Sequence, residues 1–276
     1  MKKNIQRFAL IAAAAFVISC ATNVFTGERT LKPIANDQIF PLAFAQYDEV
    51  LKESDVVTGT AESRMIKDVG QNIKTASQKW LNALGHPEYL DGYAWEYNLI
   101  KNDQVNAWCM PGGKIVFYTG ILPICQGETG TAVVMGHEVA HALANHGGQR
   151  MRAGQLQQLG QVGLAVGGAV SGTSNQTMNI LNQAYGLGSQ FGAILPFSRA
   201  QESEADKIGL ILTAIAGYNP EEGAELWRRM KANSGGEAPP EFLSTHPSTD
   251  TRIANLTQLA PVAKAEAAKY GVTKFK

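Results

Sequence analysis

The sequence Gly136-His137-Glu138-Val139-Ala140-His141 constrains this chain more than any other feature. It is an HExxH pattern within a stretch rich in small and aliphatic residues, which predicts a helix over residues 128–146. Histidines four positions apart on a helix lie on one face, separated by about 40° of rotation, so both imidazoles can reach one ion. The pattern therefore predicts a helix that binds zinc. The alternative is a surface helix with incidental histidines.

A third ligand must come from a downstream segment, because a catalytic zinc takes three protein ligands and keeps one position for water. Residues 197–216 are predicted to be helical and contain Glu202-Ser203-Glu204-Ala205-Asp206. Glu202 and Asp206 lie on one face of such a helix, so Glu202 can bind the metal while Asp206 accepts a hydrogen bond from a ligating imidazole. Glu204 projects elsewhere. The alternative for this acidic cluster is a solvated first helical turn.

His146 is a rival for the third position. It lies five residues beyond His141, which rotates it by about 140° around the helix. It could reach the same ion only if the helix bends sharply, so we expect a structural histidine there.

The remaining pattern predicts an α+β fold with many helices and few strands. Residues 61–84 repeat apolar positions at helical spacing. Apolar and polar residues alternate over residues 93–100 and again over 105–120, where a Pro-Gly-Gly sequence interrupts the second stretch. This pattern indicates a small antiparallel sheet. Shorter helices are expected over 44–52, 221–232 and 249–260. The glycine-rich stretch 159–170 is too short to span a membrane and is interpreted as a buried helix or a hydrophobic loop.

The N-terminus has the pattern of a lipoprotein signal peptide over residues 1–19. Three cationic residues precede an uncharged run over 8–19, which is too short for a membrane-spanning helix. The run ends at Ser19-Cys20, which resembles the bacterial lipoprotein cleavage site, so we expect Cys20 to be the lipidated first residue. No acidic residue follows Cys20 directly, a pattern that resembles lipoproteins of the outer membrane. The alternative is an ordinary signal peptide with an incidental cysteine.

These features divide the chain into four parts: the signal peptide at 1–19, a lipidated tether with a first helix at 20–60, a main domain at 61–260, and a tail at 261–276 that is a solvated helix or frays. Lys and Arg number 24 and Asp and Glu number 24, so no basic field supports nucleic-acid binding. Cys109 and Cys125 could form a disulfide in an oxidising compartment or remain a buried free pair.

At three places the chain resembles peptidase family M48 of zinc metallopeptidases, particularly its bacterial periplasmic lipoproteins. These places are HEVAH at 137–141, the segment 198–206, and His246-Pro247 followed by Arg252. The resemblance implies a mostly helical gluzincin-type domain with one zinc per chain. By position it assigns His137, His141 and Glu202 to the metal, Glu138 to the catalytic base, and Asp206 to the carboxylate that supports a ligating imidazole.

Four residues are candidates for the chemical steps. Glu138 would take the proton of the attacking water and deliver it to the leaving amine. Arg252, Arg199 or His246 could stabilise the oxyanion, and the sequence does not rank them. Proline after His246 restricts its backbone to extended conformations, so the imidazole could cap the metal or assist the transition state. The alternative for His246 is an ordinary core histidine.

The resemblance also implies a strand that binds an extended substrate, expected over residues 114–119. Asn106-Ala107 and Gly112-Gly113 resemble the edge-strand segment of the family. An ordinary hairpin is the alternative. The implied function is an endopeptidase of the bacterial envelope, lipid-anchored on the periplasmic face of the outer membrane, that hydrolyses misfolded or misassembled proteins. The alternative is a lipoprotein chaperone for outer-membrane assembly with little proteolysis.

Overall fold

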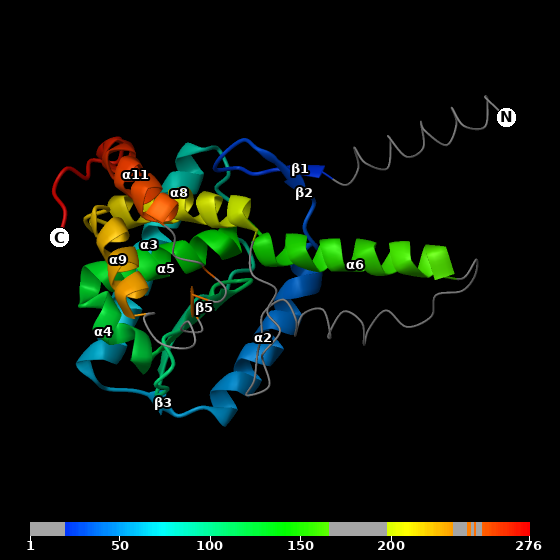
Figure 1. Ribbon diagram of the computed structural model, residues 1–276, viewed down its shortest axis with the longest axis horizontal. Coiled ribbons are helices and arrows are strands. Elements are labelled where there is room, and N and C mark those ends of the chain that lie inside the picture. The colour runs from blue at the N-terminus through cyan, green and yellow to red at the C-terminus, as the bar shows by residue number, and fades with distance from the viewer. Residues whose placement is uncertain (1–19, 166–197, 234–241, 244–245, 247–249) are drawn as a thin grey trace.

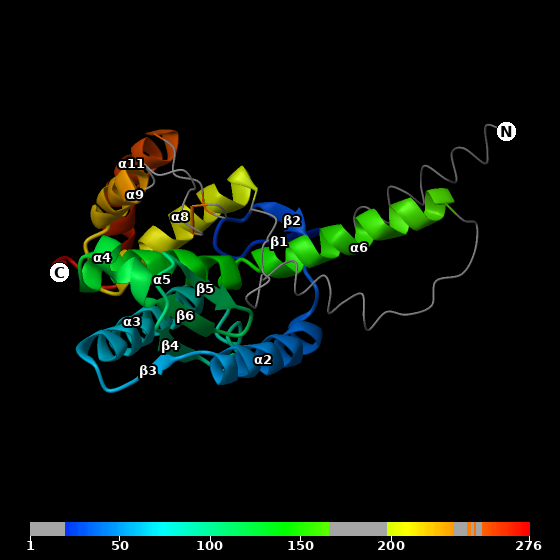
Figure 2. The ribbon, with the colours of Figure 1, turned by 60° about the horizontal axis from the view of Figure 1, so that its bottom comes forward.

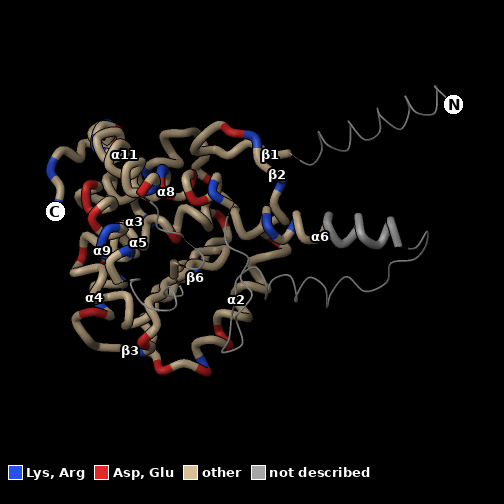
Figure 3. The backbone as a smooth tube through the Cα atoms, viewed as in Figure 1, with Lys and Arg blue, Asp and Glu red and all other residues tan. Residues whose placement is uncertain are grey.

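The computed structural model describes residues 20–165, 198–233, 242–243, 246 and 250–276, with the backbone alone over 156–165. The expected signal peptide and the end of the glycine-rich stretch, residues 166–170, lie outside this part. Figure 1 shows helices gathered around one small sheet, with α6 extending beyond the body. Positive and negative residues are interspersed along the described backbone (Figure 3).

Helices dominate the described residues, which confirms the expected class. They are α2 (Asn36–Glu53), α3 (Ala61–Ala83), the 3-10 helix η1 (Thr119–Ile121), α4 (Leu122–Cys125), α5 (Glu128–Leu143), α6 (His146–Ala165), α8 (Arg199–Ile215), α9 (Glu222–Asn233) and α11 (Asp250–Ala268). Among the described residues, none of these helices is long and apolar enough to cross a membrane.

The main sheet has four strands in the order β3-β4-β6-β5. They are β3 (Val56–Val57), β4 (Glu96–Ile100), β5 (Ala107–Met110) and β6 (Lys114–Tyr118). The pair β4 and β6 is parallel, while the other two pairs are antiparallel, so the sheet is mixed rather than purely antiparallel. The reason is that the chain leaves β4, forms β5 at the edge, and returns as β6 between them.

This order corrects the expected substrate strand. Residues 114–118 form β6, which is paired on both sides and has no open edge for a peptide. The edge strands of the described sheet are β3 and β5, and of these β5 packs against α5. The sequence of the β5–β6 hairpin does not show which of its two strands lies inside the sheet. That depends on which strand pairs with β4, a strand that is distant in the sequence.

The segment expected to be a tether begins with a β-hairpin. Strands β1 (Cys20–Thr22) and β2 (Arg29–Leu31) pair in antiparallel register. Phe25, between them, packs its ring 4.9 Å from that of Trp80 on α3. The first helix then starts at Asn36 rather than near residue 44. Apolar contact therefore holds this segment on the body of the protein.

Helix α5 is shorter than the sequence predicts, and it ends at Leu143. Asn145 adopts a left-handed backbone conformation with φ 56°, which interrupts the helical path. The chain resumes as α6 at His146, whose imidazole is fully buried. The break turns α6 away from the axis of α5 (Figure 2).

Helices α5 and α8 approach closely because glycines face each other at their crossing. A Cβ added to Gly136 would lie 2.6 Å from the carbonyl oxygen of Gly209, and a Cβ added to Gly209 would lie 2.8 Å from the Cα of His137. Helix α8 begins with a capping box, in which Ser198 Oγ accepts from the Gln201 amide and Gln201 Oε1 accepts from the Ser198 amide, both at 3.2 Å. The acidic residues of α8 are thereby held beside the two histidines of α5.

The C-terminal segment is packed rather than frayed. Helix α11 runs without interruption across the expected boundary at residue 260, and Ala263 and Ala267 are buried. The last residue, Lys276, bonds through its backbone to Gly217 and Asn219 at 2.9 and 3.0 Å. These contacts place residues 261–276 in the same domain as the helices before them.

The two downstream cysteines are both free. Cys109 on β5 and Cys125 on α4 are buried and form no disulfide. Of the two interpretations left open by the sequence, the structure has the buried free pair. Burial raises the pKa of both thiols, to about 12 for Cys125, which keeps them protonated at neutral pH.

Candidate metal centre

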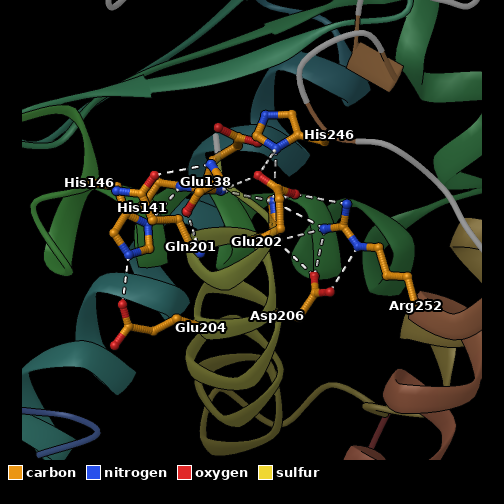
Figure 4. A network of polar contacts seen from close by, with 11 residues as sticks. Glu138, His141, His146, Gln201, Glu202, Glu204, Asp206, His246 and Arg252 are labelled. Carbon is orange, nitrogen blue, oxygen red and sulfur yellow. Dashed lines mark hydrogen bonds and ion pairs between the residues drawn. The ribbon is translucent and has the colours of Figure 1, made fainter. Parts of the chain in front are cut away.

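Four side chains from three parts of the chain converge on one point (Figure 4). His137 and His141 come from α5, Glu202 comes from the first turn of α8, and His246 comes from the segment before α11. One ligand atom from each lies within 4.8 Å of all the others, and all four residues are buried. Among the described residues, this is the group whose donors are arranged to hold a metal ion.

The distances between the donor atoms are short. His137 Nε2 lies 3.1 Å from His141 Nε2 and 3.2 Å from His246 Nδ1. Glu202 Oε1 lies 2.9 Å from His246 Nδ1 and 3.3 Å from His141 Nε2. The sequence predicts His137, His141 and Glu202 as ligands, and the structure brings these three together with His246 beside them.

The donor chemistry fits a divalent cation. His137 Nδ1 lies 3.0 Å from the Asp206 carboxylate, which fixes the proton on Nδ1 and leaves a lone pair on Nε2. Because His141 Nδ1 faces another imidazole nitrogen at 2.9 Å, its proton can also lie on Nδ1. When both imidazoles are neutral, their Nε2 lone pairs, 3.1 Å apart and next to a carboxylate, repel each other unless a proton or a metal cation lies between them. Two imidazoles and one carboxylate are the ligand set of a gluzincin zinc site.

The surroundings of Glu202, His141 and His137 shift the pKa of each group. Burial alone would raise the pKa of Glu202, but His246 and hydrogen bonds to the imidazoles outweigh it and lower the pKa, so the group is anionic. Burial lowers the pKa of His141 far below its usual range. Burial also acts to lower the pKa of His137, yet the Asp206 and Glu202 carboxylates raise it to about 9. An anionic Glu202 and a neutral His141 are forms that bind metal, whereas His137, with a pKa of about 9, would release its Nε2 proton when a metal binds.

Asp206 takes the place that the sequence predicts for it, with Arg252 behind it. Arg252 donates to both carboxylate oxygens of Asp206, at 2.8 and 2.7 Å, and its Nη1 lies 2.8 Å from Glu202 Oε2. Its guanidinium carbon lies 3.6 Å from the ring centroid of Trp227. The guanidinium is thus held against two carboxylates and an aromatic face. Its role toward an oxyanion stays a prediction, as does that of Arg199, which is exposed at the start of α8.

Glu138 is buried next to the four converging side chains. Its Oε1 accepts no hydrogen bond and lies 3.5 Å from His246 Nε2. Burial raises the pKa of Glu138, opposed by His246 and His137. A buried acceptor without a donor points to a missing polar partner, such as a water molecule or a substrate amide.

His146 is near the centre but not at the ligand position. The helix break at Asn145 brings it back toward α5, so that its Nδ1 lies 2.9 Å from His141 Nδ1, on the side of the ring away from the other donors. The sequence predicts a structural histidine here unless the helix bends; the helix does break, and His146 contacts a predicted ligand without joining the ligand cluster. An asparagine directly before the histidine was the available signal, because asparagine tolerates a left-handed backbone.

The predicted edge-strand residues lie at both ends of β5. Asn106 and Ala107 begin the strand, while Gly112 and Gly113 form the turn into β6 with φ of 82° and 84°. Tyr118 donates to the carbonyl of Asn106, so by alternation the backbone groups of Ala107 and Cys109 face away from β6. The Ala107 amide already donates to Asn106 Oδ1 at 2.9 Å, so the Ala107 carbonyl and the two backbone groups of Cys109 form the open side of the strand within the described sheet.

The fold and the converging side chains define a gluzincin-type metallopeptidase: a helix with HExxH and a glutamate from the neighbouring helix surround one site. The comparison with known families agrees. Residues 70–260 match the family described as Peptidase family M48, and the chain belongs to this family. The expectation of a metalloendopeptidase is confirmed at the level of the family.

The relatives are metalloendopeptidases and proteases by name. The chain is 37% identical over 174 residues to the mitochondrial metalloendopeptidase OMA1 of Schizosaccharomyces pombe, covering 62% of this chain and 48% of the relative. It is 33% identical over 221 residues to OMA1 of Arabidopsis thaliana, covering 78% and 42%. It is 27% identical over 169 residues to the beta-barrel assembly-enhancing protease of Escherichia coli, covering 58% and 33%. The chain thus spans less than half the length of these relatives.

Proposed function

We propose that this protein is a zinc-dependent endopeptidase that uses His137, His141 and Glu202 as metal ligands and Glu138 as general base. The observation that carries the proposal is the convergence of these ligand atoms within 4.8 Å, next to a buried glutamate whose Oε1 has no hydrogen-bond donor. Membership of peptidase family M48 supports the same reaction.

The side chains have distinct roles in this proposal. A zinc ion bound here supplies Lewis-acid chemistry, which polarises the scissile carbonyl and acidifies a water molecule. Glu138 accepts the proton of that water and delivers it to the leaving amine. Asp206 keeps the His137 proton on Nδ1, so that the lone pair of Nε2 stays available to bind the metal. Arg252 holds Asp206 in this orientation through two hydrogen bonds.

We propose that the substrates are unfolded or misassembled polypeptides bound along β5. The backbone groups of Ala107 and Cys109 face the open side of the sheet, next to α5. Main-chain bonds of this kind recognise an extended peptide with little preference for its side chains. Folded proteins seldom offer such a segment, so a peptidase of this design selects chains that have lost their structure.

We place the protein on the bacterial cell envelope, anchored through lipid on Cys20. The support is the Ser19-Cys20 sequence after the uncharged run over 8–19. Cys20 begins the hairpin on the body of the protein, so a lipid on this residue would hold the centre close to the membrane surface. The similarity to the E. coli beta-barrel assembly-enhancing protease is consistent with action on envelope proteins.

The test compares the purified protein with Glu138→Gln and His137→Ala in zinc content and in casein degradation. We expect one zinc per chain in the wild type and in Glu138→Gln, with degradation abolished in Glu138→Gln because only the base is lost. His137→Ala should lose most of its zinc. Turnover of Glu138→Gln within a few-fold of wild type would contradict the mechanism, and stoichiometric zinc in His137→Ala would contradict the ligand assignment.

The same experiment addresses a chaperone-like function. An unfolded client protein that binds equally well to wild type and Glu138→Gln, with no measurable cleavage by the zinc-loaded wild type, would favour a lipoprotein whose work is assembly rather than proteolysis.

A further inference from the structure

Each histidine of the HExxH helix is linked to its own carboxylate on α8, but by different routes. His137 Nδ1 contacts Asp206 directly at 3.0 Å. His141 Nδ1 instead contacts His146 Nδ1 at 2.9 Å, and His146 Nε2 contacts Glu204 Oε2 at 2.8 Å. We propose that His146 and Glu204 are positioning residues that fix the orientation and tautomer of His141 and tie it to the N-terminal hairpin. This inference rests on the proposed function, in which His141 is a metal ligand.

One arrangement of protons satisfies both contacts in the series from His141 through His146 to Glu204. If His141 keeps its proton on Nδ1, it donates to His146 Nδ1, and its Nε2 carries a lone pair for the metal. His146 then has its proton on Nε2 and donates to Glu204. The carboxylate at the end only accepts. The reverse tautomer of His141 would place two acceptors face to face at 2.9 Å and remove the metal donor, so the chain of contacts selects the binding form.

Burial strengthens this selection. His146 is fully buried, and the side chain of Glu204 is 10% exposed, so little water competes for these contacts. His146 presents one ring nitrogen to each neighbour, Nδ1 to His141 at 2.9 Å and Nε2 to Glu204 at 2.8 Å. A neutral ring is what a relay between a donating imidazole and a carboxylate needs.

Glu204 is in turn held by the N-terminal hairpin. Its Oε1 accepts from Asn23 Nδ2 and from Thr26 Oγ1, both at 2.8 Å. Asn23 Oδ1 accepts from the Phe25 amide at 2.8 Å, which orients the Asn23 amide group toward Glu204. The hairpin residues are 178 and 181 positions before Glu204, so this contact exists only when the hairpin is in place.

The helix break at Asn145 makes the arrangement possible. On an unbroken helix, a residue five positions after His141 would point about 140° away from it. The left-handed residue shifts His146 to the first position of α6 and directs its ring back to His141. Glu204 meets it from α8, two residues beyond Glu202 on a different side of that helix (Figure 4). Helix α8 therefore supplies both a ligand, Glu202, and a supporting carboxylate, Glu204, while α6 supplies the imidazole between Glu204 and His141.

The test measures zinc affinity of the purified protein by competition with a chromogenic chelator. We expect His146→Leu and Glu204→Ala each to weaken zinc binding by about 10- to 100-fold, as is usual when the partner of a ligating histidine is lost. Because the two residues act in series, the double variant should be no weaker than the weaker single variant. The visible absorption spectrum of the cobalt-substituted protein should change in both variants, because it reports the geometry of the ligands.

Glu128→Ala is the matched control. Glu128 also joins distant segments, since its Oε1 accepts from Tyr218 Oη at 2.8 Å and Lys276 Nζ at 2.9 Å, but it has no contact with the metal ligands. We expect its zinc affinity and cobalt spectrum to equal those of wild type. Thr26→Val is nearly isosteric and removes one hydrogen-bond donor to Glu204, so it should weaken zinc affinity by a few-fold. It tests the same contact if Glu204→Ala does not fold.

The outcomes separate the two proposals. A wild-type protein that binds no zinc would overturn the proposed function and this inference with it. Zinc bound by the wild type with affinity unchanged in His146→Leu, Glu204→Ala and Thr26→Val would overturn this inference alone. Fully additive losses in the double variant would also overturn it, because two independent effects would then replace the series relay.

Discussion

Nε2 of His246 lies 3.5 Å from Oε1 of Glu138, while Nδ1 of the same ring lies 2.9 Å from Oε1 of Glu202. One imidazole thus bridges the expected base and the expected metal ligand. His246 places a fourth donor atom within 4.8 Å of the other three, and a catalytic zinc with three protein ligands keeps its fourth position for water. Of the two roles that the sequence leaves open for His246, this geometry favours capping of the metal.

We therefore expect His246→Ala to raise basal proteolysis of casein, because removal of the imidazole opens a position beside Glu138. The measurement is the initial rate at saturating casein, together with zinc content. A rate below that of wild type with zinc retained would instead assign His246 to assistance of the transition state. An unchanged rate would reject both roles.

The glycine pair at the crossing of α5 and α8 gives a prediction about stability and metal together. Gly136→Ala places a Cβ 2.6 Å from the carbonyl oxygen of Gly209, which forces the helices apart. We expect a loss of about 1–3 kcal/mol in the free energy of unfolding by urea, typical of overpacking, and weaker zinc binding because Glu202 moves with α8. Gly223→Ala is the control, since its Cβ would crowd the movable Cδ1 end of Leu210 at 2.7 Å and otherwise make an ordinary contact with Leu256 Cδ2 at 3.7 Å. Equal effects of the two substitutions would contradict the prediction.

The packed C-terminus predicts a pH dependence of stability. Hydrogen bonding from Lys276, aided by Tyr218, lowers the pKa of Glu128 below its ordinary value. An acid with a depressed pKa in the folded state stabilises the fold above its unfolded pKa and loses that contribution as the pH falls through the folded pKa. Glu128→Gln should therefore reduce stability at pH 7 and leave it nearly unchanged in strong acid.

Urea unfolding of wild type and Glu128→Gln at several pH values measures this difference. High salt should shrink it, because the pair with Lys276 is partly exposed. A difference that is constant across the pH range would mean that the carboxylate charge is not what holds the C-terminus.

Lipid on Cys20 predicts a change of cell fraction. Cys20→Ser should release the protein from the membrane fraction, because it removes the thiol to which the proposed lipid is attached. Casein degradation by the released protein should equal that of wild type, since Cys20 lies outside the converging side chains. Continued tight association with membranes after alkaline carbonate washing would contradict the anchor.

Helical spacing explains why much of the site could be predicted from sequence. The relation of His137 to His141, and of Glu202 to Asp206, is a local property of four residues on one turn of helix. The family resemblance then supplied the pairing of the two helices, which no local pattern contains. The composition and periodicity likewise predicted the α+β class, because α3 and α8 have clear apolar faces and clear starts.

The features that sequence reasoning missed depend on single dihedral angles or on distant contacts. Asn145 interrupts a stretch whose apolar pattern favours one continuous helix. The placement of β6 inside the sheet depends on pairing with β4, and neither strand encodes which neighbour it takes. The hairpin at residues 20–31 has almost no periodic pattern, and its position depends on Phe25 packing against Trp80.

The order in which the converging side chains occur along the chain affects when the enzyme can first act. His137 and His141 are made early, Glu202 follows about sixty residues later, and His246 and Arg252 come near the end. Chains grow from the N-terminus during synthesis, so a nascent chain that has not passed Arg252 lacks the guanidinium that orients Asp206 and Glu202. The proposed centre therefore cannot be completed until the chain has been made as far as Arg252.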